Sequence, residues 1–350
     1  MKKLRIAYQP FSNNLSHPGD RRRVVFWAER RGHTLTTDFS EKADVIILSE
    51  RADFGAFAQK APGTPIILDL IDGYLAPENY LTDLGRGVSK VLFGQVSGIP
   101  KPFTSFIKVL CTKISGVICS TPEQLTTISP FSSNIHTILD SHHEFPIIPF
   151  TPKIQKNDGG QSILWEGLPA TLSGVKEIKA TLNHLSEEFS LSSVYVTDLN
   201  YNKFLGRYWK CDTKDILMRN LGRSYETASL VPWSKENLIS SARSSALAAI
   251  PINLSSPLQY LKPENRLLIM WRLGLPCLTS DSPAYSRVSK IVDSDTICVS
   301  ESDWTSKMKT LLTQQDIAEQ IVINGQKYIR ENVNEEILLE KWDHAVASVL

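Results

Sequence analysis

The sequence predicts an α/β protein that consists of two domains, and three observations lead to this prediction. Short apolar runs that suit buried strands alternate with segments of helical periodicity along the whole chain. The length of 350 residues is typical of two domains of ordinary size. Residues 146–161 combine three prolines with an Asn-Asp-Gly-Gly run, which is typical of a linker. We therefore expect domains at residues 1–150 and 151–333, followed by a last helix at residues 334–350.

The composition narrows the class of protein. An apolar content of 42% and a charged content of 21% are those of a folded globular protein, and the net charge of +1 gives no case for a nucleic-acid partner. The five cysteines have no Cys-x-x-Cys spacing, and the sequence has no leader-like or membrane-spanning apolar run. We therefore expect a cytoplasmic protein with free thiols.

The first half begins with a strand, a polar loop and a helix at residues 21–31 that Gly32 ends. The loop holds His17, Gly19 and Asp20. We expect Asp20 to cap the helix, as Asp often does, and the arginines at residues 21–23 to form a solvated face. The strands expected in this half are at residues 3–8, 33–37, 45–48, 65–70, 116–119 and 134–139.

Two aspartates mark the end of the strand at residues 65–70. Asp69 and Asp72 lie at its carboxyl end, where open α/β sheets bind ligands. Asp72 is the best candidate for a functional acidic residue in the first half, because Gly73 and Tyr74 follow it in a loop after the strand. A plain turn aspartate explains the same pattern.

Residues 76–114 are expected to be helical, basic and partly apolar. No acidic residue lies between Arg86 and Lys113, and aromatic and aliphatic residues are interspersed with the cations. A basic amphipathic segment at residues 86–113 suits a peripheral contact with an anionic membrane. The alternative is an ordinary helix pair packed on the sheet, which the glycines and prolines at residues 94–102 favour.

Asp140, His142 and His143 follow the last strand of the first half. They suggest a metal site, but two adjacent histidines rarely share one ion and no second cluster supports them. We interpret this segment as a loop that leads into the linker and carries a ligand contact. Asp293 and Asp295 are interpreted as a surface turn.

The second half alternates strands and helices in the same way. No element is assigned to residues 198–223. Strands are expected at residues 163–167, 194–197, 229–233, 246–252, 275–279 and 296–299, and helices at residues 174–189, from Ser234, from Pro263 and at residues 335–350.

The helix that starts near Pro263 is the strongest candidate for a ligand site. Pro263 suits the first helical position, and Gly274 suits the position past the end, where φ is often positive. The first N–H groups of a helix carry partial positive charge, and Lys262 and Arg266 flank this start. The arrangement suits a diphosphate, although two solvated cations beside a connecting loop explain it equally well.

The residues of this stretch also carry a family resemblance. Lys-Pro-Glu-Asn-Arg-Leu, then Gly-Leu-Pro, a strand and Ser-Pro-Ala-Tyr resemble the donor-binding half of GT-B glycosyltransferases of the retaining family-4-like group. The opening of the chain and the segment from SGVICSTPEQL to NIHTILDSHHEF resemble the same group. The resemblance implies two Rossmann-like domains that face each other across a cleft, with the C-terminal helix crossing back to the first domain.

The resemblance further implies that the chain transfers a hexose from a nucleotide diphosphate sugar to a glycan or lipid-linked acceptor, in surface polysaccharide or glycoconjugate synthesis. No metal or other cofactor is expected. The residues it places at the nucleotide sugar are Lys262, Glu264, Asn265, Arg266, Gly167, Ser173, Gly174 and Trp233. Those placed at the acceptor are Gly19, Asp20 and His142, with Asp72 and His17 as the catalytic candidates.

Two positions depart from the family pattern. Ile269 stands where many relatives have a glutamate, and Lys176 is the only cation in the loop where relatives carry an arginine and a lysine. Glu264 is then expected to contact ribose hydroxyls, or simply to stabilise a helix start. These departures keep open a non-catalytic relative that binds a glycan or a partner enzyme. A nucleotide-sugar epimerase is a further alternative, but the carboxylates and the histidine that it needs at the cleft are not located.

Overall fold

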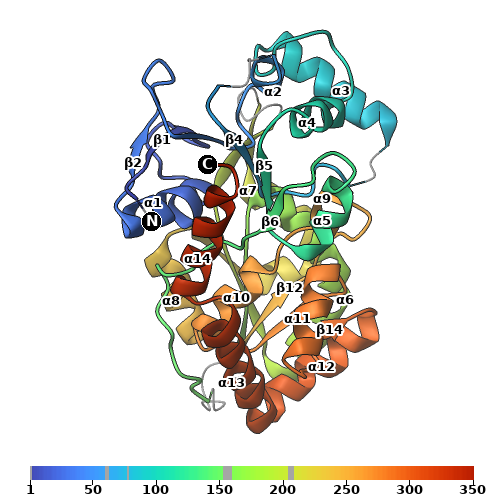
Figure 1. Cartoon of the computed structure of the whole chain (residues 1–350). Helices are drawn as coiled ribbons and strands as arrows, with labels where there is room; N and C mark the ends of the chain where they lie inside the picture. Colours follow the sequence, from blue (N-terminus) through green and yellow to red (C-terminus); the bar gives the residue numbers. More distant parts are fainter. Residues whose placement is uncertain (1, 60–62, 77–78, 153–159, 204–208) are drawn as a thin grey trace. The chain divides into compact units, whose positions relative to one another are not determined.

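The computed structural model describes residues 2–59, 63–76, 79–152, 160–203 and 209–350 (Figure 1). The chain divides into two compact units. Unit 1 contains Met1–His143, Leu261–Pro263 and Val333–Leu350, and unit 2 contains Glu144–Tyr260 and Glu264–Asn332. Each unit holds a six-stranded sheet in which all strand pairs are parallel, so the predicted α/β class is confirmed.

The sheet of unit 1 has the strand order β2-β1-β3-β4-β5-β6. The strands begin close to the predicted positions, and the apolar runs of β1, β3, β4 and β5 are mostly buried, as suits the inner strands of a parallel sheet. The strands are β1 (Arg5–Gln9), β2 (Thr34–Thr36), β3 (Val45–Leu48), β4 (Ile66–Leu70), β5 (Gly116–Cys119) and β6 (Ile135–Thr137).

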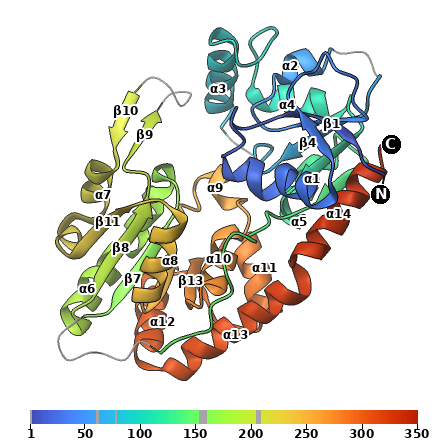
Figure 2. The ribbon, with the colours of Figure 1, turned by 90° about the vertical axis from the view of Figure 1, so that its left-hand side faces the viewer.

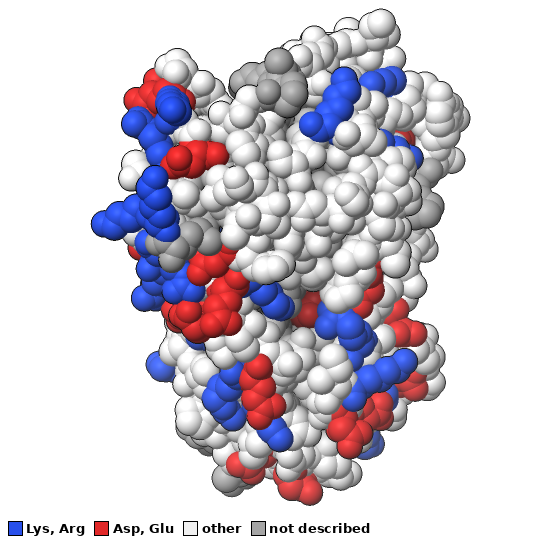
Figure 3. Space-filling view, viewed as in Figure 1, with Lys and Arg blue, Asp and Glu red and all other residues white. Residues whose placement is uncertain are grey.

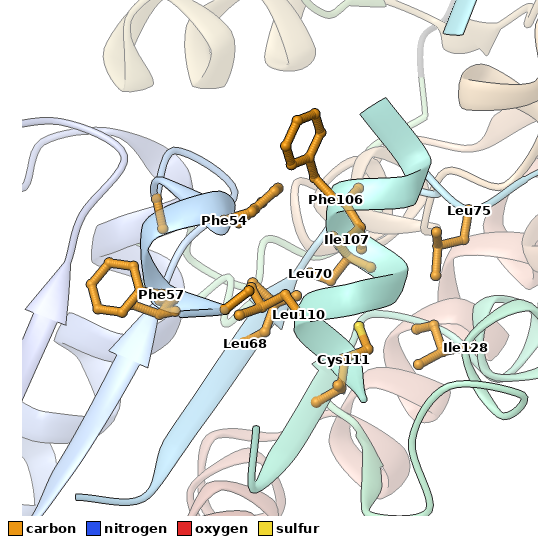
Figure 4. Close-up of a cluster of buried hydrophobic side chains, with 14 of the residues drawn as sticks. Phe54, Phe57, Leu68, Leu70, Leu75, Phe106, Ile107, Leu110, Cys111 and Ile128 are labelled. Atoms are coloured by element: carbon orange, nitrogen blue, oxygen red, sulfur yellow. The ribbon is translucent and has the colours of Figure 1, made fainter. Parts of the chain in front are cut away.

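Helices pack on this sheet and complete its core. A buried hydrophobic cluster joins α2 (Phe54–Phe57) and α4 (Phe103–Cys111) to β3, β4 and β5, with Phe106, Ile107 and Leu110 of α4 pointing into it (Figure 4). The remaining helices of unit 1 are α1 (Val25–Arg31), α3 (Tyr80–Leu92), α5 (Pro122–Ile128) and α14 (Glu335–Ala347).

The C-terminal helix α14 packs on α1 and β6 of unit 1. Trp342 is fully buried and stacks on Trp27 of α1 at 5.6 Å between ring centroids. Asp343 accepts hydrogen bonds of 2.8 Å from Trp27 Nε1 and from Arg31 Nε. The last helix of the chain is therefore part of the core of the unit that the first residues build.

The sheet of unit 2 has the order β11-β8-β7-β12-β13-β14. A separate antiparallel pair, β9 (Asn200–Lys203) and β10 (Trp209–Asp212), projects beyond α7 (Thr213–Leu221) in Figure 2. These three elements lie where the sequence yielded no assignment. The parallel strands are β7 (Ser162–Glu166), β8 (Ser192–Thr197), β11 (Ala228–Pro232), β12 (Leu247–Ile250), β13 (Cys277–Ser280) and β14 (Ile297–Cys298).

In unit 2, helix α10 packs closely against α13. Gly325 lies against Trp271 of α10 so tightly that a Cβ at this glycine would lie 2.2 Å from the indole ring. The helices are α6 (Lys179–Phe189), α8 (Lys235–Ser244), α9 (Pro257–Tyr260), α10 (Asn265–Arg272), α11 (Pro283–Ile291), α12 (Glu301–Thr313) and α13 (Gln315–Asn332).

The helix predicted at residues 21–31 is present, and its first turn at Asp20–Val24 is π-helical and continues into α1. Two other predicted helix starts are wrong. The helix predicted from residue 174 is a 3₁₀ segment at Pro169–Ile178, and α6 follows it. Helix α10 begins at Asn265 instead of Pro263, because its first bond runs from Leu268 N to Glu264 O. The predicted helix ends hold, since Gly32 and Gly274 have φ of +67° and +74°.

Among the residues that the structure describes, no helix combines the length and the apolar composition that crossing a bilayer requires.

Candidate functional site

The carboxyl end of the sheet in unit 2 gathers several polar side chains that sequence spacing leaves apart. In open parallel sheets, ligands bind beyond the carboxyl ends of the strands, where loops and the first turns of helices contact them. At the end of β7, Glu166 Oε1 accepts a hydrogen bond of 2.9 Å from Trp233 Nε1, just past β11. Arg266 Nη1 of α10 donates to the Glu166 carbonyl oxygen at 3.0 Å. The site therefore joins β7, β11 and α10.

Gly167 allows this approach of the guanidinium group. A Cβ at Gly167 would lie 2.9 Å from Arg266 Nη1 and 3.0 Å from Thr171 Oγ1. A side chain at this position would displace the Arg266 guanidinium group from the end of β7, so the absence of a Cβ allows the contact. The structure thus brings Gly167, Arg266 and Trp233 together at the end of β7, and their contact with a nucleotide sugar stays a prediction.

Glu264 and Asn265 form the start of α10. Glu264 is fully buried, and its Oε1 accepts a hydrogen bond of 2.8 Å from Arg287 Nη2 of α11. The carboxylate is therefore bound by an arginine of the protein. Asn265 Oδ1 is buried and has no hydrogen-bond partner among the described residues. An unpaired buried acceptor is costly, which marks Asn265 as a position that a ligand donor would satisfy.

Three hydroxyl groups at the same edge were not found from the sequence. Thr197 of β8, Thr279 of β13 and Ser282 are fully buried, and their hydroxyl oxygens have no partner within the described part of the chain. Ser282 is the N-cap of α11 but makes no capping bond. The signal for Ser282 was present as a serine before a proline at a predicted strand end, whereas Thr197 and Thr279 read only as strand residues.

Ser173 and Gly174 do not lie at the start of α6, where they were predicted, and their contact with the diphosphate stays a prediction. Both lie inside the 3₁₀ segment, and α6 starts five residues after Gly174. Gly174 packs against the carbonyl oxygen of Pro251, 2.3 Å from where a Cβ would be, and Ser173 Oγ accepts from Gln259 Nε2 at 3.4 Å.

In unit 1 the carboxyl end of the sheet presents two carboxylates and a lysine. Glu50 follows β3, Asp72 follows β4, and Lys262 belongs to the short segment Leu261–Pro263 that is part of this unit. Glu50 Oε1 accepts a hydrogen bond of 2.5 Å from the backbone N–H of Asp72. Lys262 Nζ lies 3.6 Å from Asp72 Oδ1.

The two carboxyl groups of this cluster differ in burial, and burial changes the pKa of Glu50. Burial and the negative charge of Asp72 raise the pKa of Glu50 well above its usual range. Asp72 is partly exposed, with 32% of its side chain accessible. The raised pKa favours the protonated form of Glu50, whose carboxyl group binds the backbone N–H of Asp72, and the Asp72 carboxylate lies beside Lys262. Lys262 and Arg266, predicted as a pair, belong to different units.

The loop before α1 is organised by Asp20. Its carboxylate accepts four hydrogen bonds of 2.7–3.0 Å, from Tyr8 Oη, Phe11 N, Ser12 N and Ser12 Oγ. No side-chain capping bond is made at this helix start, so the predicted cap is wrong. The reason is that the backbone N–H groups of Phe11 and Ser12 in the loop bind the carboxylate instead. Asp20 is fully buried and holds the loop that presents His17.

His17 is exposed, stacks on Phe11 at 4.9 Å and accepts a hydrogen bond of 3.0 Å at Nδ1 from Gly19 N. Desolvation lowers its pKa, so the ring is neutral at neutral pH. Because Nδ1 accepts, the proton of the neutral ring is on Nε2, which then donates. Gly19 lies against the Phe11 ring, 2.8 Å from where a Cβ would be, and this contact keeps the loop compact.

The arginines at residues 21–23 do not form a solvated face, which corrects that prediction. Arg23 is fully buried, binds Asp69 with both Nε and Nη2 and contacts Asp140 Oδ1 through Nη1 at 3.0 Å. Asp69 and Asp140 therefore neutralise a buried cation. His142 is also buried, in the same segment as Asp140, so a direct acceptor contact would require local movement. No three His, Cys, Asp or Glu side chains of the described ranges are grouped as a metal site.

Comparisons with known proteins identify the fold of the chain through structural similarity alone. No protein-family model matches it, and no curated protein matches it by sequence. WaaG, a glycosyltransferase involved in lipopolysaccharide biosynthesis, aligns over 99% of this chain and 98% of its own, with a TM-score of 0.58 and 11% identity. A UDP-forming trehalose-phosphate synthase from Burkholderia xenovorans aligns over 87% of this chain and 74% of its own, with a TM-score of 0.56 and 12% identity.

TarM aligns over 86% of this chain with a TM-score of 0.60 and 12% identity. The chain spans about half of TarM, since the alignment covers 54% of that protein. A mutant of S. aureus TarM is known in complex with fondaparinux, α-GlcNAc-glycerol and UDP. At these identities the likeness concerns the fold, and it confirms the predicted GT-B architecture of two α/β units.

Proposed function

We propose that the chain is a glycosyltransferase that moves a sugar from a nucleotide diphosphate sugar to a glycan or lipid-linked acceptor. The observation that carries the proposal is the alignment of nearly the whole chain, both units included, with nearly the whole of WaaG. TarM binds UDP, and the trehalose-phosphate synthase is UDP-forming, which favours a UDP-sugar as the donor. The role of WaaG in lipopolysaccharide biosynthesis favours synthesis of a surface polysaccharide or glycoconjugate.

Unit 2 is proposed to bind the donor at the carboxyl end of its sheet. The leaving diphosphate gains negative charge as the glycosidic bond breaks, and a fixed cation with free N–H groups stabilises it. Arg266 supplies the cation, and the Ser282 hydroxyl, which has no partner among the described residues, supplies a donor at the same end of the sheet. Asn265 Oδ1 is an acceptor, so it suits a hydroxyl group of the donor instead of its diphosphate. Trp233 offers an indole face to the base. No carboxylate stands at Ile269, which is buried, so the hexose itself is held by other groups.

Unit 1 is proposed to bind the acceptor. Asp72 orients the acceptor hydroxyl or takes its proton, and Lys262 keeps a positive charge beside the carboxylate. His17 acts in this scheme as a hydrogen-bond donor through Nε2 instead of as a base. Gly19 and Asp20 hold the loop in shape. From the family resemblance, we also propose that the transfer retains the configuration at the anomeric carbon of the sugar.

A peripheral membrane contact through residues 86–113 is also proposed, for a lipid-linked acceptor. Leu92 and Ile99 are 74% and 84% exposed, and Phe93 is half-exposed between them. Lysines and arginines dominate the charged surface over α3 and α4 at the upper right of Figure 3. Exposed apolar side chains beside cations suit an anionic bilayer surface. Co-sedimentation of the protein with anionic vesicles, compared with neutral ones, tests this contact.

The experiment for the proposed function is a thermal-shift panel of UDP, GDP, dTDP and ADP sugars, followed by transfer assays. A bound donor raises the unfolding midpoint by mass action, and we expect a UDP-sugar to do so. Arg266→Ala should weaken donor binding about 10- to 100-fold, which is the effect of losing a hydrogen bond to a charged group. Combining it with Lys262→Ala should nearly abolish transfer.

Arg223→Ala is the matched control, because Arg223 is exposed and also belongs to unit 2. It should bind and turn over the donor as the unchanged protein does. Full transfer by the Lys262/Arg266 double variant would contradict the assignment. Donor binding without turnover on any glycan acceptor would instead support the non-catalytic alternative that Ile269 keeps open.

A further inference from the structure

The side chain of Glu166 carries one polar atom to which the scheme above gives no role. Glu166 is the last residue of β7, at the carboxyl end of the sheet of unit 2. Its Oε1 accepts the hydrogen bond from Trp233 Nε1, whereas its Oε2 is buried and has no hydrogen-bond partner among the described residues. A buried acceptor without a partner is costly, so we expect this oxygen to meet a donor group of a ligand.

The Glu166 side chain reaches across β8 to Trp233. Strand β8 lies between β7 and β11 in the sheet (Figure 2), and Glu166 is opposite Val196 of β8. Trp233 follows β11, and its backbone N–H donates to the carbonyl oxygen of Thr197, the last residue of β8, at 3.0 Å. The carboxyl group and the indole ring therefore meet at the carboxyl end of β8.

Trp233 fixes the orientation of the carboxyl group. The indole Nε1 can only donate, so it holds Oε1 at 2.9 Å and leaves Oε2 as the remaining acceptor. The N–H bond lies in the plane of the indole, so the carboxyl group is at the edge of the ring instead of over its face. A base that stacks on the indole face presents the atoms of its own edge on this side.

The backbone of Glu166 is bound by the cation that we propose for the diphosphate. Its carbonyl oxygen accepts a hydrogen bond of 3.0 Å from Arg266 Nη1. Arg266 belongs to α10, which leads from β12 to β13, and β12 is the neighbour of β7 on the side away from β8. A nucleoside diphosphate with its phosphates at Arg266 can therefore extend along the end of the sheet toward Trp233.

Nucleotide bases differ in the group that they present to an acceptor. On the Watson–Crick edge, uracil, thymine and guanine carry a ring N–H, whereas cytosine and adenine carry a ring nitrogen that accepts. A carboxylate oxygen binds the ring N–H and is left opposite a second acceptor in the other two bases. A site built to bind an N–H rejects an analogue without it, because its own buried group is left unpaired.

We propose that Glu166 Oε2 accepts a hydrogen bond from the N3–H group of the donor's pyrimidine base and thereby selects uridine over cytidine diphosphates. The inference rests on the proposed function for the presence of a nucleotide in unit 2. Glu166 sets the specificity for the base, and Trp233 orients the carboxyl group through Nε1.

Titration calorimetry of the full chain with UDP and CDP tests this role. In Glu166→Gln the amide oxygen stays at the Trp233 Nε1 donor, so the NH₂ group takes the place of Oε2 and faces the base. We expect the unchanged protein to prefer UDP by about 10- to 100-fold, the effect of one hydrogen bond to a charged group, and Glu166→Gln to prefer CDP. Glu187→Gln is the matched control, because Glu187 is an exposed glutamate of α6 in the same unit, and it should keep the UDP preference.

The double variant Glu166→Gln/Trp233→Phe tests the orienting role of the indole. Without Nε1 the amide can turn either way, so the CDP preference of Glu166→Gln should disappear. Unfolding midpoints measured without nucleotide show whether each variant is folded. If Glu166→Gln is not, Glu166→Ala replaces it and should bind UDP and CDP equally.

The outcomes separate this inference from the proposed function. A UDP preference that Glu166→Gln and Glu166→Ala both keep overturns the role of Glu166 and leaves the donor site in place. Equal binding of UDP and CDP by the unchanged protein also overturns it, and weaker binding of 2′-deoxy-UDP would then assign Oε2 to a ribose hydroxyl. If neither nucleotide binds, the proposed function fails together with this inference. If the preference reverses but no sugar is transferred, the inference holds and the non-catalytic alternative is supported.

Discussion

Glu50 is a residue whose importance depends on its surroundings rather than on its type. Its carboxyl group is buried at the end of β3 and binds the backbone N–H of Asp72 at 2.5 Å. The neighbouring Asp72 carboxylate and the buried Asp69 both disfavour a charge on it, which raises its pKa further. Glu50 therefore fixes the Asp72 turn while retaining a proton that an exposed glutamate would lose.

This protonation predicts how stability depends on pH. Below the usual carboxyl pKa, Glu50 is protonated in the folded and unfolded states alike. As pH rises, the unfolded chain releases the proton while the folded chain keeps it, so the free energy of unfolding falls until the raised folded pKa is reached. Glu50→Gln should therefore stabilise the protein at pH 8 by on the order of 1 kcal/mol, with little effect near pH 4.

Chemical denaturation at both pH values measures this difference. Glu340→Gln is the control, because Glu340 is an exposed glutamate of the same unit. Equal stability of Glu50→Gln and the unchanged protein at pH 8 would show that Glu50 is ionised in the folded state.

At the scale of elements, α3 and α4 are packed backbone to backbone at one glycine. A Cβ at Gly87 of α3 would lie 1.8 Å from the carbonyl oxygen of Lys101 and 2.8 Å from Phe103 N. Gly85, two residues earlier in the same helix, has nothing within 4 Å of the equivalent position. The two glycines thus separate a packing effect from a helix-propensity effect.

Gly87→Ala should lower the free energy of unfolding by about 1–3 kcal/mol or more, because backbone atoms cannot rotate out of the way. Gly85→Ala should raise it by up to about 1 kcal/mol, the helix-propensity gain of alanine over glycine. Urea denaturation of the two variants measures both changes. A Gly87→Ala protein as stable as Gly85→Ala would mean that α3 and α4 are further apart than described.

At the scale of the whole molecule, unit 1 is built from both ends of the chain. Trp342 of α14 is buried against Trp27 of α1, and Trp304 of α12 is buried within unit 2. Each tryptophan therefore reports on one unit. Trp342→Ala should cost unit 1 about 3–5 kcal/mol, and Trp304→Ala should cost unit 2 a similar amount.

Differential scanning calorimetry measures this division. If the units unfold in separate transitions, we expect Trp342→Ala to lower one of them and Trp304→Ala to lower the other. Both variants lowering the same transition by the same amount would show that the two units unfold as one cooperative body.

The sequence alone determined the class of fold and the order of its elements. Buried parallel strands need runs of apolar residues, and helix ends need glycines that tolerate positive φ, so β4, β11 and the ends at Gly32 and Gly274 are local properties of the chain. Residues 198–223 gave no such pattern, and β9, β10 and α7 were missed there. The placement of Asp72 after β4 and of Arg266 in α10 also follows from local sequence.

Only the tertiary structure decided which polar groups meet. Arg23 pairs with Asp69 and Asp140, which are 46 and 117 positions away, and it lies in the core where the sequence predicted a solvated face. Asp20 binds loop amides instead of a helix start, and the Ser282 hydroxyl has no partner within the described residues at the end of the sheet. Periodicity reports which face of an element is buried, whereas the partner of a buried charge is set by how distant elements pack.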